Sequence, residues 1–238
     1  MLFKGEIMKK ILWAATLTCL AGCGSAVTMK APEGISGAQA YPVERPKGSS
    51  SIGKQQWKVG DYEIKDVNRK GQKSKGGSVG GYSSSKTKGG FTFTVVAPDG
   101  GKAEFECETK STEKGSALGG GMSLGWNWQS MKCTGDAGTV TVDPPENEGD
   151  PIGSIDASIG KLKMTALYEL SNGKTQKKPA GYLFADADGK NVAAMDVNGQ
   201  GVLHLGSEAQ KENPPTVVGA GIAMLLFTEF VSQQSGKM

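Results

Sequence analysis

Apolar residues recur at every second position in several separate stretches of the chain, which is the pattern of strands with one buried face. The most regular stretch lies in the last third of the chain, at Leu162, Met164, Ala166, Tyr168 and Leu170. This stretch predicts a strand packed on a core through that face.

Three further stretches predict strands in the same way. Ala103, Phe105 and Cys107 alternate with glutamates, so that one face is apolar and the other charged. Shorter apolar patterns at 57–67 and 140–142 are typical of strands as well.

The parity of the apolar positions changes between residues 122 and 133. Met122 and Trp128 occupy even positions, whereas Met131 and Cys133 occupy odd ones. A β-bulge or a turn near residues 129–130 would account for this change.

Two tight-turn pairs divide the segment after residue 180 into a predicted meander. The pairs Asp188-Gly189 and Asn198-Gly199 suit two-residue hairpins, because both tolerate the positive φ angles that such turns require. They separate predicted strands at 181–187, 191–197 and 200–206.

The segment Val217–Val231 is apolar on every side except at Thr228 and Glu229, which is typical of a buried helix. It is shorter than the roughly 20 residues that span a bilayer. Glycine accounts for 36 of the 238 residues and disfavours long helices elsewhere. We therefore predict a mainly β fold, an antiparallel barrel or sandwich packed around or against one C-terminal hydrophobic helix.

The last 75 residues or so resemble the tubby and phospholipid-scramblase-like β-barrels. The segments that carry the resemblance are 182–184, 192–197, 201–205 and 217–230. The resemblance implies a closed barrel around a C-terminal apolar helix, and it brings no catalytic residues. An unrelated β-sandwich with one packed helix is the alternative.

The N-terminus has the pattern of a secretion signal, with Lys9-Lys10 before a short apolar run. The run ends at Leu20-Ala21-Gly22-Cys23, which resembles the lipobox of bacterial lipoproteins. The resemblance implies that residues 1–22 are removed, that Cys23 is lipidated, and that the lipid anchors the chain in a membrane. Gly24 follows the cysteine, as in lipoproteins that are delivered to the outer membrane. This resemblance implies that the protein faces the periplasm or the cell surface.

Composition divides the rest of the chain into a tether and one domain. Residues 23–55 are rich in Ser, Gly, Pro and Ala and predict a flexible tether. Residues 56–238 form one predicted β-rich domain. Within it, residues 69–90 are dense in Lys, Gly and Ser, and they predict a mobile basic loop.

Charge is distributed unevenly, since residues 42–90 carry 11 basic and 4 acidic side chains. Such a segment suits an anionic partner, either an anionic lipid or an envelope polymer. A solvated tail balanced by an acidic body is the alternative. Tyr82 is the only aromatic residue between 69 and 90, so nucleic acid is not expected as a partner. The candidate contacts are Arg69, Lys70, Lys73, Lys75, Lys86 and Lys88.

Two of the four cysteines, Cys107 and Cys133, remain in the domain after Cys19 is removed with the signal and Cys23 is lipidated. An even pair in an oxidising compartment predicts a disulfide. Two cysteines and the single histidine, His204, do not have the spacing of a zinc site, so no metal or other cofactor is expected.

The chain shows no sequence pattern of a catalytic site. His204 lies in a predicted strand, no Gly-x-Ser-x-Gly motif is present, and Glu104 and Glu106 fit the wet face of a sheet. We therefore expect a non-enzymatic binding or structural role in the cell envelope. The alternatives are a barrel that binds a lipid or other amphiphile, and a carboxylate-dependent envelope enzyme acting on glycans.

Overall fold

The computed structural model describes residues 27–35, 37–46, 55–118, 122–144, 152–157, 160–211 and 214–235. At residues 117–118, 122–128, 152, 157 and 233–235 only the backbone is described. The predicted signal peptide and the predicted lipidation site at Cys23 lie outside the described residues.

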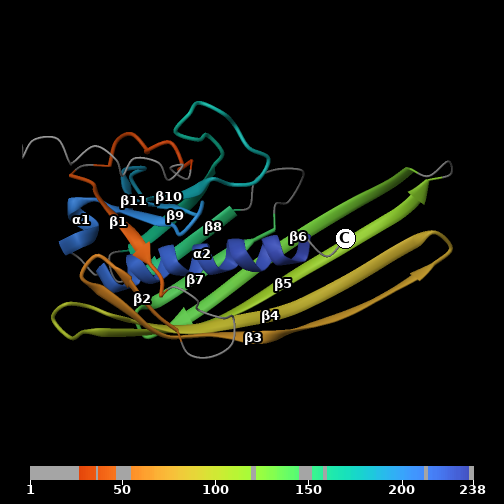
Figure 1. Cartoon of the computed structure of the whole chain (residues 1–238), viewed down its shortest axis with the longest axis horizontal. Coiled ribbons are helices and arrows are strands. Elements are labelled where there is room, and N and C mark those ends of the chain that lie inside the picture. Colours follow the sequence, from red (N-terminus) through yellow and green to blue (C-terminus); the bar gives the residue numbers. More distant parts are fainter. Residues whose placement is uncertain are drawn as a thin grey trace, which may run out of the picture.

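Twelve strands in the described part of the chain close into one antiparallel barrel, which confirms the predicted mainly β fold (Figure 1). Each strand pairs with its neighbours in sequence, and the barrel closes where β1 pairs with both β2 and β12. The strands are β1 (Gln39–Glu44), β2 (Gln55–Val59), β3 (Tyr62–Val79), β4 (Tyr82–Val96), β5 (Lys102–Leu118), β6 (Met122–Gly135), β7 (Gly138–Asp143), β8 (Ile152–Ala157), β9 (Gly160–Leu167), β10 (Gly181–Ala185), β11 (Asn191–Asp196) and β12 (Val202–Leu205).

The C-terminal meander follows the prediction closely. The strands β10, β11 and β12 occupy the expected segments, and the predicted turn pairs separate them. Gly189 and Gly199 have φ angles of 81° and 59°, which glycine adopts without strain. The connections are longer than the expected two-residue hairpins, since five residues separate β10 from β11 and five separate β11 from β12.

The apolar helix lies inside the barrel. After the short helix α1 (Ser207–Lys211), α2 (Pro214–Ser235) passes through the interior and contacts β4 to β8 and β11. Its apolar side chains from Val217 to Phe227 are at most 3% exposed. A helix with apolar side chains on all sides needs such an enclosure, because no face of it is stable in water.

Residues 23–55 are not a tether throughout, which corrects the expectation from composition. β1 is a barrel strand, and its Val43 is fully buried. Upstream, Met29 forms a β-bridge with Leu170, and its backbone N–H donates to Asp196 at 2.7 Å. The few apolar residues of this segment are too widely spaced to show a period, and their partners are distant in sequence.

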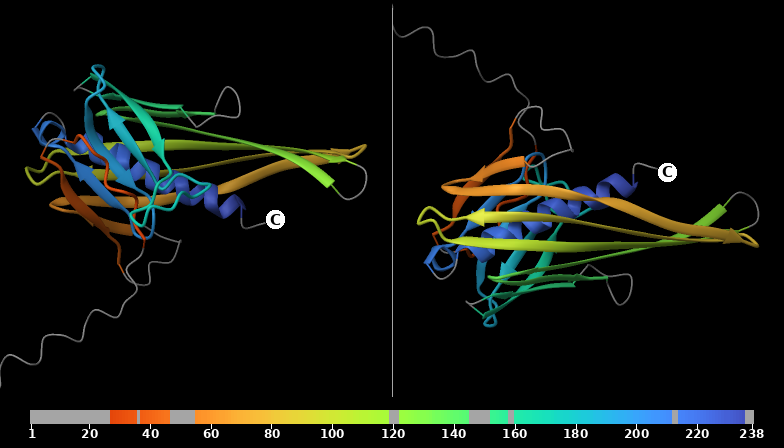
Figure 2. Two further views of the ribbon diagram at one scale, coloured as in Figure 1. Left: turned by 90° about the horizontal axis from the view of Figure 1, so that it is seen from above. Right: turned by 90° about the horizontal axis from the view of Figure 1, so that it is seen from below.

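Residues 69–90 form a β-hairpin and not a loop, which corrects a second expectation. β3 and β4 continue through this segment to a turn at Gly80-Gly81, and β5 and β6 extend beside them. The segment contributes few apolar side chains to a core. Its backbone is nevertheless ordered, because β4 pairs with β5 along this length. The four extensions project beyond the barrel as one sheet, here called the arm, which consists of residues 73–79, 82–88, 110–118 and 122–130 (Figures 1 and 2).

The β-bulge or turn predicted near residues 129–130 is not present in β6, so this prediction is wrong as well. The strand pairs with β5 residue by residue from Gly135 to Met122. The parity of apolar positions changes because β6 leaves the barrel: β7 pairs with it only from Met131 to Gly135. Beyond Met131 the odd positions of β6 are polar, at Gln129 and Asn127.

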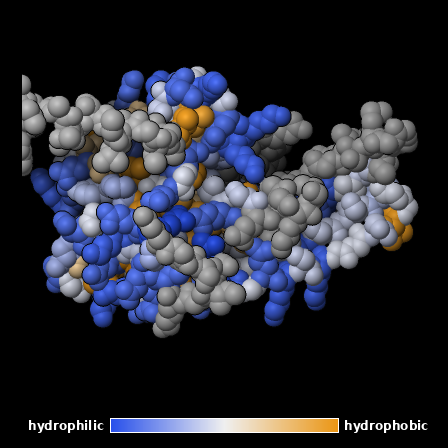
Figure 3. Space-filling view, in the orientation of Figure 1, coloured by the Kyte–Doolittle hydropathy of each residue, from blue (hydrophilic) through white to orange (hydrophobic). Residues whose placement is uncertain are grey.

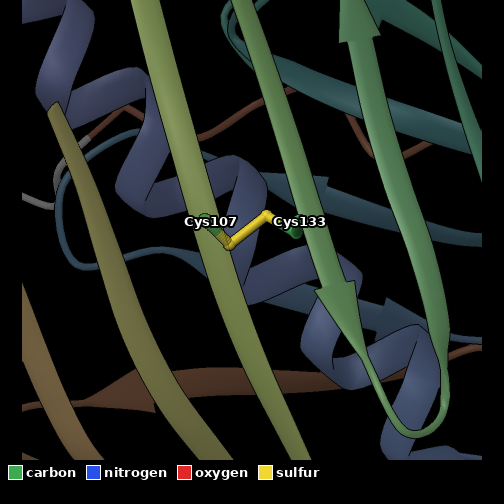
Figure 4. Close-up of a disulfide and its surroundings, with 2 residues drawn as sticks. All are labelled: Cys107 and Cys133. Carbon is green, nitrogen blue, oxygen red and sulfur yellow. A yellow bond between two sulfur atoms is a disulfide. The ribbon is translucent and has the colours of Figure 1, made fainter. Parts of the chain in front are cut away.

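The predicted disulfide joins Cys107 of β5 to Cys133 of β6 (Figure 4). The two residues are directly opposite in register, and both are fully buried against the core. The bond links two long strands at the level where they pass from the barrel toward the arm.

The two rims of the barrel are distinct. Because the strands alternate in direction, the turns that follow β2, β4, β6 and β10 lie at one rim, here called the base. The other rim, here called the arm end, carries the arm and the loop 168–180. Met29 lies at the arm end through its bridge to Leu170, and α2 runs from the base toward the arm end, where Phe230 lies beside Gly89.

Candidate functional site

Lysines from three adjacent strands share the outer face of the arm. Lys73 of β3 lies opposite Lys88 of β4, which in turn lies opposite Lys110 of β5. Two residues closer to the tip, Lys75 lies opposite Lys86. We call this surface the lysine face; its residues are Lys73, Lys75, Lys86, Lys88, Lys110 and Lys114, and all are exposed.

Strand alternation places these lysines on one face. In β4 the odd positions continue the apolar side of the barrel from Phe91 to Thr87, so the even-numbered lysines lie on the opposite side. The inner face of the arm is polar but uncharged near the barrel, where the Ser74 and Thr87 hydroxyls lie 2.8 Å apart.

The lysine face carries no acidic residue in the described part of the arm. Glu113 is the one acid among the arm residues, and it belongs to the other face, where the Ser85 hydroxyl donates to it at 3.5 Å. Like charges directly opposite each other destabilise a sheet. The row of Lys73, Lys88 and Lys110 therefore contributes nothing favourable to folding, and it attracts anions.

The structure separates the six predicted contact residues into two groups. Lys73, Lys75, Lys86 and Lys88 lie on the lysine face. Lys70 lies nearer the barrel and forms an exposed ion pair with Glu106. Arg69 forms an ion pair with Glu229 of α2 and is not part of the surface.

Sequence reasoning missed Lys110 and Lys114, which lie outside the basic segment 69–90. A signal was present, because these lysines continue the polar parity of Glu104, Glu106 and Glu108 along one strand. What the sequence does not reveal is that β5 lies beside β4, which brings Lys110 next to Lys88.

At the tip of the arm, two large apolar side chains of the described residues are exposed. Val79 is 85% exposed and Tyr82 is 72% exposed, and they lie opposite each other across the turn. Their positions have the same parity as the lysines of β3 and β4, so they extend the lysine face to the tip. Figure 3 shows an apolar spot at this far end of the arm.

A half-buried ion cluster fixes the end of α2 to the arm end of the barrel. The carboxylate of Glu229 accepts hydrogen bonds from Arg45 and Arg69. The Arg45 guanidinium also stacks over Trp57, 4.3 Å from the ring centroid. Arg69 therefore helps to fix α2 in the barrel.

The carboxylates expected on the wet face of β5 line a shallow hollow of about 640 Å³ on the outer wall of the barrel. Glu104 and Glu106 share it with Asp66 and Asp136. A hydrogen bond from Lys70, together with its charge, lowers the pKa of Glu106, the opposite of the raised pKa that a catalytic acid requires. The described residues include no cluster of His, Cys, Asp and Glu able to hold a metal ion.

His204 lies on β12 between buried Leu203 and Leu205, and it is itself half-buried. Burial lowers the pKa of His204, an effect that the negative charge of Asp196 partly offsets. At neutral pH this histidine is therefore uncharged.

Side chains fill the space between α2 and the barrel wall at the two glycines of the helix. A Cβ atom added at Gly219 would lie 2.3 Å from the ring of Phe105, and one at Gly221 would lie 2.8 Å from Leu203. The helix is long and apolar enough over Pro214–Ser232 to cross a membrane, but 72% of its most apolar window is buried inside the barrel.

No family model, curated protein or solved structure matches this chain.

Proposed function

We propose that this chain is a lipid-anchored protein of the bacterial cell envelope, which binds an anionic partner through the lysine face and catalyses no reaction. The row formed by Lys73, Lys88 and Lys110 carries the proposal, because it places like charges side by side on an exposed sheet. The lipobox-like segment ending at Cys23 supports the placement in the envelope.

The spacing of the lysines suits a partner with many closely spaced negative charges. Adjacent strands lie about 4.8 Å apart, and residues two apart on one strand about 7 Å. Phosphates or carboxylates at similar spacing contact several lysines at once, and each contact releases bound counterions. Binding of this kind weakens steeply with added salt.

Affinity for a soluble polyanion tests the proposal. Heparin serves as the probe, and the protein is a chain beginning at Gly24, which retains every described residue. Changing Lys73, Lys75, Lys86 and Lys88 together to Gln is expected to weaken heparin binding about tenfold at 0.1 M salt, because each exposed ion pair contributes about 0.2–1 kcal/mol. The measurement is the dissociation constant from calorimetry over a range of salt concentrations.

A matched control removes the same charge elsewhere. Lys58, Lys102, Lys161 and Lys163 are exposed lysines of the barrel, and their joint change to Gln leaves the arm intact. We expect this control to bind heparin nearly as the unchanged protein does. Equal losses in the two variants would show that net charge alone determines binding, and the proposal would then be wrong.

A further inference from the structure

We infer that the anionic partner is the surface of a phospholipid bilayer, the same membrane that holds the lipid anchor, and that the arm tip inserts into its headgroup region. This inference rests on the proposed function, since it names the partner of the lysine face. Three independent features of the structure favour a bilayer over a soluble polymer.

The first feature is the tip. Val79 and Tyr82 are two of the three large apolar side chains that the described residues expose, and they lie side by side. A polyanion offers nothing for an exposed valine to contact. A bilayer does, and tyrosine is a side chain that favours the membrane interface, with its ring among acyl chains and its hydroxyl in water.

The second feature is the position of the anchor. Thr28 is fixed at the arm end of the barrel, because its carbonyl accepts a hydrogen bond from the backbone N–H of Ser171. Cys23 is five residues upstream of Thr28. Five residues span at most about 18 Å in any conformation, so a lipidated Cys23 holds the arm end close to the membrane.

The length of the arm fits this distance. Residues 73–79 of β3 extend beyond the last row shared with the barrel. At 3.2–3.4 Å per residue, this places the tip about 20 Å from the rim, close to the reach of the chain that leads to Cys23. One membrane surface can therefore accommodate both the lipid and the arm tip.

The third feature is the charge of the neighbouring loop. Lys174, Lys177 and Lys178 are exposed on the loop between β9 and β10, at the arm end and close to Thr28. The turns at the base are acidic on balance instead, with five aspartates against one lysine, Lys190. The aspartates are Asp61, Asp99, Asp136, Asp186 and Asp188. The described cationic surface therefore consists of the arm and this loop.

Flotation with vesicles tests the inference. The chain beginning at Gly24, without lipid, is mixed with vesicles of phosphatidylcholine alone or with 30% phosphatidylglycerol. We expect binding only to the anionic vesicles, and loss of it at 0.5 M salt. Val79→Ser with Tyr82→Ser is expected to weaken this binding at least fivefold while leaving heparin binding unchanged, because the tip contributes contact with the bilayer interface and no charge.

A fluorescent label reports the orientation. Cys107 and Cys133 are bonded to each other, so Tyr82→Cys provides a single free thiol for a polarity-sensitive dye, and Asp99→Cys provides the matched label at the base. With anionic vesicles the emission of the dye at position 82 is expected to shift to the blue, whereas the dye at position 99 stays unchanged.

The outcomes separate the inference from the proposed function. Heparin binding without vesicle binding would overturn the bilayer and leave an anionic polymer as the partner. Vesicle binding with the dye shifted at position 99 and not at position 82 would overturn the orientation. Absence of binding to both probes would overturn the proposed function itself.

Discussion

At the scale of single residues, Glu229 is a partly buried carboxylate that pairs with two arginines. It lies near the end of α2, is 25% exposed, and pairs with both Arg45 and Arg69. Two nitrogens of the Arg45 guanidinium are buried without a hydrogen-bond partner, so this arginine depends on Glu229 and on the Trp57 ring. Removing the carboxylate leaves two half-buried positive charges beside each other.

We therefore predict that Glu229→Gln lowers the free energy of unfolding by about 1–3 kcal/mol, less than for a fully buried pair because the cluster is partly exposed. Glu169→Gln is the matched control, since the Lys30–Glu169 pair is about half exposed at both side chains. Glu169→Gln is expected to lower the free energy of unfolding by less than about 1 kcal/mol. Urea denaturation measures both values, and equal losses would contradict a special role of the cluster.

At the scale of elements, the close contact between α2 and the barrel wall depends on two glycines of the helix, Gly219 and Gly221. Gly219 faces Phe105, whose ring is stacked on Phe93 with centroids 5.0 Å apart and has little freedom to move. Gly221 faces the end of the flexible Leu203 side chain. The two glycines are on the same helix, so a change to alanine brings the same gain in helix propensity at both.

We predict that Gly219→Ala destabilises the protein by about 1–3 kcal/mol, because an overpacked interior forces the ring or the backbone to shift. Gly221→Ala should be close to neutral, since the end of Leu203 can move and the helix gains up to about 1 kcal/mol. Thermal melting of the two variants checks the order. A Gly221→Ala variant that is less stable than Gly219→Ala would argue against the described fit of the helix.

Sequence patterns predicted those elements in which apolar and polar side chains follow a regular pattern. The strands of the meander and α2 are examples, because their burial requires alternation or apolar side chains on all sides. β1 was missed because it pairs with β12, which is distant in sequence. The arm was missed because its residues near 69–90 are poor in apolar side chains, and its order comes from backbone pairing between consecutive strands. For the same reason, the candidate site was only partly predicted: composition indicated four lysines of the face, while Lys110 depends on the pairing of β4 with β5.

At the scale of the whole molecule, the arm, the start of the described chain and the end of α2 all lie at one end of the barrel. This polarity matters for function only if the chain is attached to a membrane just upstream of Thr28. The attachment at Cys23 is therefore the central claim of the account, because it determines both the compartment and the surface that the arm meets.

Mass spectrometry of the protein purified from the membranes of cells that process bacterial lipoproteins tests this claim most directly. We predict an N-terminal peptide that begins at Cys23 and carries a diacylglyceryl group on the thiol and an acyl group on the amine, and we predict that Cys23→Ser abolishes both modifications. An unmodified Cys23, or a mature chain that begins at another residue, would contradict the account.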